Sequence, residues 1–172
     1  MFFALWPEPT IRTRLAALLP GLAEAGRPVA ADNLHLTLAF LGPTSARQQA
    51  CMETWAAGLS CPAFTLELNH YGHWPGPRVA WLAPEQWPEA LGELAAALAE
   101  GMRHCGLVPD PRPYRPHITL LRKARVLPEG LPELHIPWQI QGFVLCESCS
   151  SAQGVEYRVL RRFGLFPESP SM

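Results

Sequence analysis

Lysine is almost absent from this chain of 172 residues, which has Lys123 alone against 13 arginines. Positive charge in general is not in excess, because the formal net charge is -1 and the isoelectric point is near 6.6. These values exclude a protein that coats nucleic acid through its overall charge, although a local basic patch stays open. The preference for arginine fits phosphate binding by guanidinium groups, and a GC-rich genome explains it equally well.

Long apolar runs are also missing. The apolar stretch from Met1 to Trp6 has no basic residues before it and stops at Pro7 and Glu8, and no later segment approaches about 18 uninterrupted apolar residues. We therefore expect neither an export signal nor a membrane span. Hydrophobic residues still make up 48% of the chain, which excludes a disordered class and fits one domain or two small lobes sharing a core.

The cysteines lack the even number and regular spacing of a disulfide framework. Cys51, Cys61, Cys105, Cys146 and Cys149 are five in number, so we expect reduced thiols and a cytoplasmic location. Cys146 and Cys149 have CxxC spacing, but they follow a predicted strand instead of preceding a helix, as the cysteines of a thioredoxin-like site do.

Metal-binding patterns are missing as well. His70-Tyr71-Gly72-His73 contains no glutamate and lies at a predicted turn, so it does not match a zinc protease motif. Asp110 and the scattered glutamates form no recognisable two-metal set. The sequence therefore predicts no metal and no other cofactor.

One short motif, in contrast, is present twice. In residues 33–41 and again in residues 116–121, a histidine and a threonine stand two positions apart between aliphatic residues. In a strand this spacing puts His35 and Thr37 on one face and the leucines between them on the other, and it does the same for His117 and Thr119. The histidines are 82 positions apart, nearly half of the chain, which indicates an internal duplication.

The remaining pattern alternates strands and helices. We expect a strand at residues 1–6, a helix at 10–25 that Pro20 threatens to interrupt, a helix from Thr44 or Ser45 to about 59, and a helix from Pro88 to about 105. Residues 64–71 and 78–82 are predicted to form a hairpin, and residues 138–146 and 155–163 two long strands joined near 150–154. This order predicts an α+β fold of two lobes, each giving one His-x-Thr strand to a shared cleft.

Two imidazoles in one cleft suit displacement at phosphorus. Near neutral pH one histidine can accept a proton while the other donates one, because their ordinary pKa is about 6.5. Each transfer is typically worth about 10²- to 10⁴-fold in rate. Thr37 and Thr119 would then donate hydrogen bonds to the non-bridging oxygens, where negative charge builds up.

The two segments, residues 26–42 and 115–122, resemble the 2H phosphoesterase superfamily and, within it, the bacterial RNA 2',3'-cyclic phosphodiesterases, also called 2'-5' RNA ligases. The resemblance covers nearly the whole chain as one bilobal domain, residues 1–172, with HxTx motifs at 35–38 and 117–120. It implies two antiparallel sheets flanking a central cleft, helices packed outside and a pseudo-twofold relation. It further implies metal-independent hydrolysis of an RNA 2',3'-cyclic phosphate to a 2'-phosphate, with His35 as proton donor and His117 as proton acceptor, and 2'-5' ligation as the reverse reaction.

The predicted partner is RNA, with tRNA fragments as one candidate, bound by a monomer away from any membrane. Arg122 matches a family arginine after the second motif and is a candidate phosphate ligand. A second group could hold the flanking RNA backbone, and aromatic residues could stack on a base. The backbone candidates are Arg112, Arg115, Lys123 and Arg125, and the stacking candidates are Phe40, Trp74, Tyr114 and Tyr157.

Two alternatives stay open at this point. The same cleft could serve a related activity on 2'-5' oligonucleotides or small cyclic nucleotides, or it could bind terminal phosphates of RNA without turnover. Retention of two protonatable histidines favours an enzyme, because binding needs donors only.

Overall fold

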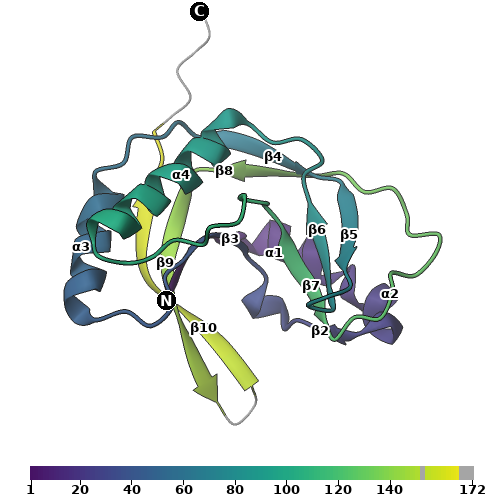
Figure 1. Ribbon diagram of the computed structural model, residues 1–172. Coiled ribbons are helices and arrows are strands. Elements are labelled where there is room, and N and C mark those ends of the chain that lie inside the picture. Colours follow the sequence, from purple (N-terminus) through teal and green to yellow (C-terminus); the bar gives the residue numbers. More distant parts are fainter. Residues whose placement is uncertain (152–153, 167–172) are drawn as a thin grey trace, which may run out of the picture.

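The fold is α+β and is built around one large antiparallel sheet (Figure 1). The computed structural model describes residues 1–151 and 154–166. The strands are β1 (Phe2–Leu5), β2 (Arg27–Pro28), β3 (Leu36–Phe40), β4 (Phe64–Leu68), β5 (His70–Trp74), β6 (Val79–Ala83), β7 (Ile118–Arg122), β8 (Ile136–Ile140), β9 (Gly142–Ser151) and β10 (Gly154–Gly164). Seven of them run in the order β10-β9-β1-β3-β7-β6-β5, β2 pairs with β7, and β4 and β8 form a separate two-stranded sheet.

The helices are α1 (Pro9–Ala16), α2 (Leu19–Leu22), α3 (Ala46–Ala57) and α4 (Glu89–His104), with 3-10 turns η1 (Ala23–Ala25) and η2 (Ala31–Asn33). The helix predicted for residues 10–25 is thus present but interrupted. Pro20 lies in the first turn of α2, where its missing N–H costs nothing, so a new helix starts there instead of the old one continuing.

The predictions for α3 and α4 are confirmed. Ser45 caps α3 through a capping box with Gln48, and Pro88 precedes the first residue of α4. Leu91, Leu94 and Leu98 recur at helical spacing on the buried side of α4. Burial of that stripe holds the helix against the sheet.

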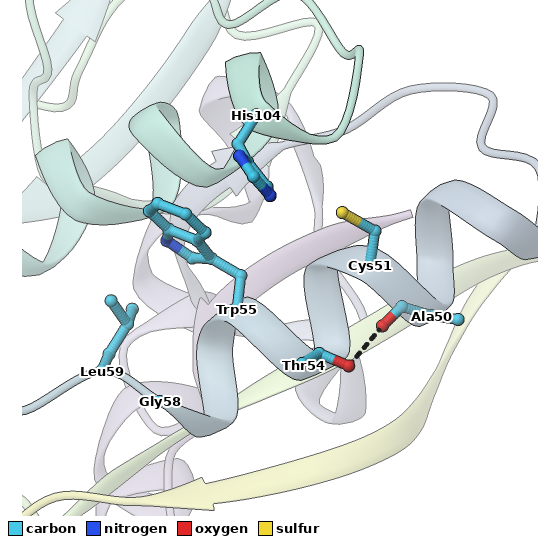
Figure 2. Close-up of a pocket in the computed structure, with 7 residues that line it drawn as sticks. All are labelled: Ala50, Cys51, Thr54, Trp55, Gly58, Leu59 and His104. Atoms are coloured by element: carbon cyan, nitrogen blue, oxygen red, sulfur yellow. Dashed lines mark hydrogen bonds between the residues drawn. The ribbon is translucent and has the colours of Figure 1, made fainter.

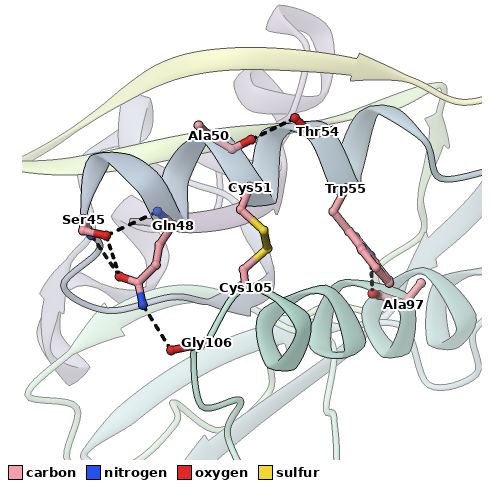
Figure 3. The surroundings of a disulfide bond; sticks show 9 residues. All are labelled: Ser45, Gln48, Ala50, Cys51, Thr54, Trp55, Ala97, Cys105 and Gly106. Carbon is pink, nitrogen blue, oxygen red and sulfur yellow. Dashed lines mark hydrogen bonds between the residues drawn. A yellow bond between two sulfur atoms is a disulfide. The ribbon is translucent and has the colours of Figure 1, made fainter.

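A disulfide between Cys51 and Cys105 joins α3 to the end of α4 (Figure 3). The expectation of reduced thiols is therefore wrong for these two cysteines. Their Cα atoms lie 5.8 Å apart, within the range a disulfide bridges, because Trp55 packs on Gly101 and donates its indole N–H to the Ala97 oxygen, which draws the helices together. Sequence spacing carries no sign of this contact.

The predicted hairpin of residues 64–71 with 78–82 is wrong for residues 64–68. These residues form β4, which leaves the large sheet and pairs with β8, whereas residues 70 and 71 belong to β5, which pairs with β6. Asn69, between β4 and β5, bonds through its N–H to the Ala83 oxygen and through its side chain to the Glu85 N–H, which fixes the bend. Alternate apolar residues of β4 and β8 pair with one another and are buried on the same face of this small sheet. Local periodicity does not reveal such a pairing between distant segments.

Likewise, the strand predicted for residues 138–146 divides into β8 and β9 around Gln141. Gly142 begins β9 where the Phe163 carbonyl oxygen would lie only 2.6 Å from an added Cβ. The predicted pairing of β9 with β10 is present. The turn expected near 150–154 includes residues 152 and 153, which lie outside the described residues.

The two motif strands, β3 and β7, lie side by side in the middle of the large sheet and share one residue pair, Leu36 with Ile118. Beyond that pair the strands separate, and β2 takes the place of β3 beside β7 through Arg27 with Arg122 and Pro28 with Leu121. The aliphatic residues of both motifs are buried in the main core, as expected. The sheet is therefore open on the face that carries the histidines and threonines.

Candidate active site

The two motif histidines are held by the same hydrogen bond. Nδ1 of His35 lies 2.7 Å from the Asn33 carbonyl oxygen, and Nδ1 of His117 lies 2.8 Å from the Arg115 carbonyl oxygen. A carbonyl oxygen only accepts, so in each neutral ring the proton is on Nδ1 and the lone pair is on Nε2. Nε2 of His35 lies 3.1 Å from the Thr37 hydroxyl, and Nε2 of His117 has no partner among the described residues. Both rings therefore present an Nε2 that can accept a proton, or donate one when the ring is charged.

A β-bulge follows the threonine in each motif. On β1, Phe2 and Ala4 point to the same face, and they pair with Phe40 and Thr37 of β3. Because three positions of β3 match two positions of β1, the alternation shifts by one and Phe40 joins Thr37 on the open face.

The second motif contains the same kind of β-bulge. On β6, Val79 and Trp81 share a face, and they pair with Arg122 and Thr119 of β7. The same one-residue shift therefore brings Arg122 onto the face of Thr119. Phe40 and Arg122 hold equivalent places in the two halves, so the cleft has an aromatic ring on one side and a guanidinium on the other.

Aromatic rings enclose His35. The centroid of Phe2 lies 4.8 Å from that of the imidazole, Tyr157 meets it edge-on at 5.0 Å, and Trp6 stacks on it at 5.7 Å with 13° between the planes. His117 has one such neighbour, Trp74, at 4.5 Å in an edge-on arrangement. The first imidazole is therefore the more strongly desolvated of the two.

The pKa values follow this difference. Burial, with a smaller contribution from the charges of Arg122 and His117, lowers the pKa of His35 from 6.5 to about 4, against the opposing effect of the Asn33 carbonyl. Burial also lowers the pKa of His117, which the Arg115 carbonyl partly offsets. The surroundings of both rings thus favour neutral imidazoles.

Trp6 was not predicted as a site residue. Its indole is stacked between His35 and the guanidinium of Arg12, which lies 5.4 Å from the ring centroid. Arg12 in turn donates to the Pro7 oxygen and to Asp32. The only sequence signal was that Trp6 ends the strand next to the first motif, and this signal does not separate it from a core aromatic.

Tyr157, a predicted binding residue, reaches the site from the β9-β10 hairpin, which projects from the body of the protein in Figure 1. Asn33 ties the hairpin down, since its side-chain amide donates to the Val155 oxygen at 2.7 Å and accepts from the Tyr157 N–H at 3.3 Å. Asn33 therefore holds both the tyrosine, through its side chain, and His35, through its carbonyl.

An open groove of about 790 Å³ starts at His117 and Thr37 and extends along α4. Phe40, 66% exposed, forms part of its wall. Tyr114 donates its hydroxyl to the Thr37 oxygen at 3.2 Å, and burial raises its pKa, so it anchors the loop to β3. The other lining residues are Leu38, Ala39, Trp74, Pro75, Gly76, Pro77, Gly92, Ala95, Ala96, Ala99, Met102, Pro109, Asp110, Arg112, Pro113, Arg115 and His117, together with Thr37.

The predicted backbone-binding cluster divides in two. Arg112 and Arg115 line the groove, and Arg112 is paired with Asp110, which lowers the pKa of that carboxyl to about 2. Lys123 and Arg125 follow Arg122 at the opposite end of β7.

The patterns set aside in the sequence hold no metal site. Within residues 1–151 and 154–166, no group of three or more histidine, cysteine or acidic residues is placed to bind a metal ion. Cys146 is buried, and this burial raises the pKa of its thiol to about 12. The thiol of Cys149 contacts the carboxylate of Glu147 and not Cys146. No helix in the described part of the chain has the length and apolar character needed to cross a bilayer.

A second hollow lies beside the disulfide, between α3 and α4 (Figure 2). His104 packs on Trp55 there with ring centroids 5.1 Å apart. It contains neither motif and no second histidine. Its lining residues are Ala50, Cys51, Thr54, Trp55, Gly58, Leu59 and His104.

Comparison with known proteins agrees with this geometry. Residues 7–140 match the family model described as the 2'-5' RNA ligase superfamily. The chain belongs to this superfamily. A member from Escherichia coli strain K12, named RNA 2',3'-cyclic phosphodiesterase, is 41% identical, with 96% of each chain covered. A protein of the same name from Thermus thermophilus is 34% identical over 96% of this chain and 89% of that one.

Solved structures of the superfamily share the fold. The crystal structure of E. coli LigT in apo form has a TM-score of 0.88 and 37% identity, with 96% of each chain covered. A structure titled phosphoesterase has a TM-score of 0.90 and 38% identity, covering 96% of this chain and 97% of that one. The α+β 2H phosphoesterase fold predicted from the motifs is confirmed.

Proposed function

We propose that this protein hydrolyses 2',3'-cyclic phosphate ends of RNA to 2'-phosphates by acid-base catalysis with two histidines. The observation that carries the proposal is the paired arrangement of His35 and His117, each with Nδ1 bonded to a carbonyl and Nε2 available. The names of the E. coli and Thermus relatives support it, as do the solved E. coli LigT complexes with 3'-AMP and with phosphate.

In the reaction, Nε2 of His117 accepts a proton from water as the water oxygen bonds to phosphorus. The bond from phosphorus to the ribose 3'-oxygen breaks, and His35 gives its Nε2 proton to that oxygen. The phosphate stays on the 2'-oxygen, His117 ends protonated and His35 neutral, and exchange with solvent restores both. Attack by a ribose hydroxyl in place of water is the corresponding 2'-5' ligation.

Thr37 and Thr119 donate hydrogen bonds to the non-bridging oxygens in this scheme, and Arg122 pairs with the phosphate. The Thr37 hydroxyl contacts Nε2 of His35, so a substrate oxygen would replace that contact. In the same proposal Phe40 and Tyr157 contact the nucleoside, and Arg115, which lines the groove, contributes to substrate binding.

His35→Ala and His117→Ala test the mechanism. Each is expected to lower kcat/KM on a short RNA ending in a 2',3'-cyclic phosphate by at least about 10²-fold, because each removes one proton-transfer partner. His104→Ala, an exposed histidine of the second hollow, is the matched control. Near-normal activity in either folded motif variant would refute the two-histidine mechanism.

The products test the assignment of donor and acceptor. Chromatographic separation of the phosphate isomers is expected to show the 2'-phosphate, and a dominant 3'-phosphate would mean that the roles of His35 and His117 are reversed. The same assay with 2'-5' oligonucleotides and with small cyclic nucleotides tests the related activities. Tight binding of the RNA end without product would instead support a binding module.

We also propose that the chain acts as one bilobal domain and as a monomer, because both histidines come from the same chain. Gel filtration with light scattering tests the monomer. We propose a cytoplasmic location, because the substrate is RNA. The Cys51–Cys105 disulfide is an observation against this location, because disulfides are rare in reducing compartments.

A further inference from the structure

Ion pairs leave one group of cations unmatched. Five arginines pair with carboxylates: Arg12, Arg103, Arg112, Arg158 and Arg161. The others have no carboxylate partner within the described residues, and several of them come together on three paired strands. We call this group the basic edge and define it as Arg27, Arg78, Arg122, Lys123 and Arg125, all exposed.

Strand pairing assembles the basic edge from three separate segments. Arg27 of β2 stands directly opposite Arg122 of β7, and Val79 of β6, which follows Arg78, stands on the other side of Arg122. The Ala124 N–H bonds to the Arg78 oxygen at 2.8 Å and the Arg125 N–H to the Ala25 oxygen at 2.9 Å. The chain is therefore pinned so that five cations share one edge of a protein with a net charge of -1.

This arrangement opposes stability. Like charges directly across a strand pair repel each other. In addition, Arg78 and Lys123 have φ of 56° and 54°, a left-handed conformation that glycine or asparagine adopts more easily. Strained and self-repelling groups are expected where a ligand uses them, and the complementary ligand here is a polyanion.

The basic edge is continuous with the candidate active site. The β7 bulge turns Arg122 onto the face of Thr119, and Arg27 is its direct neighbour on that face. The guanidinium of Arg27 reaches toward β10, since an added Cβ on Gly154 would lie 3.9 Å from its Nη2. The groove with Phe40 in its wall instead leads away from His117 along α4.

We propose that the basic edge binds the backbone phosphates of the RNA that precede the terminal cyclic phosphate, through its members other than Arg122, which pairs with the terminal phosphate itself. The inference rests on the proposed function and adds that the natural substrate is an oligonucleotide or longer RNA, not a mononucleotide. In an RNA that ends in a 2',3'-cyclic phosphate, the chain continues only on the 5' side of the terminal nucleotide. The preceding nucleotides would therefore lie along the basic edge, and the terminal nucleoside would lie in the groove.

The first test compares substrates of different length. Cytidine 2',3'-cyclic phosphate and an octaribonucleotide with the same end are hydrolysed by the wild type and by Arg27→Gln/Arg78→Gln. The double variant is expected to lose about tenfold or more in kcat/KM on the octamer at low salt and to stay within about twofold on the mononucleotide, which has no preceding phosphates. Arg47→Gln, at an exposed arginine in α3 with no ion pair among the described residues, is the control for loss of positive charge away from the basic edge.

The second test does not require turnover. Anisotropy of a labelled octaribonucleotide ending in a 2'-phosphate gives its Kd over a range of salt concentrations. For single-stranded RNA each phosphate contact contributes about 0.7 to the slope of log Kd against log salt, so loss of two contacts is expected to reduce the slope by about 1.4.

An unchanged slope, or equal losses on mononucleotide and octamer in a variant with wild-type circular dichroism, would overturn the proposal. Equal weakening of poly-glutamate binding would show a general anion surface and overturn the assignment to RNA. If the wild type hydrolyses neither substrate, the proposed function fails, and the anisotropy slope still decides the basic edge.

Discussion

The desolvation of the two histidines predicts a difference between the pH profiles of kcat/KM and kcat. Burial, Arg122 and His117 lower the pKa of His35 to about 4, and burial lowers that of His117. The reaction needs one proton on the pair, so the free enzyme loses its active form as the pH rises above these values. A bound phosphate anion favours the imidazolium, so the same groups titrate at a higher pH in the complex.

The size of the effect follows from His35. A fall in pKa from 6.5 to about 4 corresponds to roughly 3 kcal/mol against the charged ring, at about 1.36 kcal/mol per pH unit. With this pKa, only about one His35 ring in 10³ of the free enzyme would be protonated at pH 7. We therefore expect the basic limb of kcat/KM to have its midpoint below pH 6.5, and that of kcat to lie at least about one pH unit higher.

Steady-state rates on cytidine 2',3'-cyclic phosphate between pH 4.5 and 9 would measure both profiles, with these limits chosen to span about two pH units around the ordinary histidine pKa. Arg122→Gln removes a positive charge that lowers the pKa of His35, so its kcat/KM profile is expected to shift to higher pH although its rate falls. Arg47→Gln is expected to leave the profile in place. A wild-type kcat/KM midpoint above pH 7, or coincident profiles, would refute the desolvated histidine pair.

Four further outcomes are expected. Tyr114→Phe loses the hydrogen bond to the Thr37 oxygen and is expected to cost about 1 kcal/mol in urea unfolding, with a severalfold loss of kcat/KM; no change in either would contradict its anchoring role. Gly72→Ala would place a Cβ 2.0 Å from the Trp81 ring, and thermal unfolding should show a loss of about 1 to 3 kcal/mol. Cys51→Ala/Cys105→Ala opens a bridge across 54 positions and is expected to lower the unfolding free energy by about 4 kcal/mol, while thiol titration of the unreduced, denatured wild type should count only Cys61, Cys146 and Cys149. Activity is expected to survive exhaustive EDTA treatment, because neither motif has a metal ligand set; loss on chelation with recovery on added zinc would reverse that expectation.

Much of the site was predictable because it depends on local alternation. The two His-x-Thr motifs, the burial of their leucines and the helices around Ser45 and Pro88 follow from periodicity and capping within short windows. The fold class followed from the order of such elements. The meeting of the two motifs in one site followed from their assignment to central strands of the sheet.

What escaped prediction depends on contacts between distant segments. Residues 64–68 pair with a strand that begins 68 positions after Leu68, at Ile136, and no local signal separates that pairing from a hairpin with residues 78–82. The Cys51–Cys105 bond and the stacking of Trp6 on His35 have the same origin. The bulges are the subtlest case, because alternation alone puts Arg122 on the face opposite Thr119.

The single residue pair between β3 and β7 has a mechanical consequence. Each half of the sheet is tied internally by several strand pairs, but Leu36 and Ile118 are their only ladder contact along these two strands. The separation of the two imidazoles is therefore not set by a ladder of hydrogen bonds between the motif strands. It depends on the packing of the leucines and isoleucine of both motifs in one shared core, and on β2, which pairs with β7 where β3 no longer does.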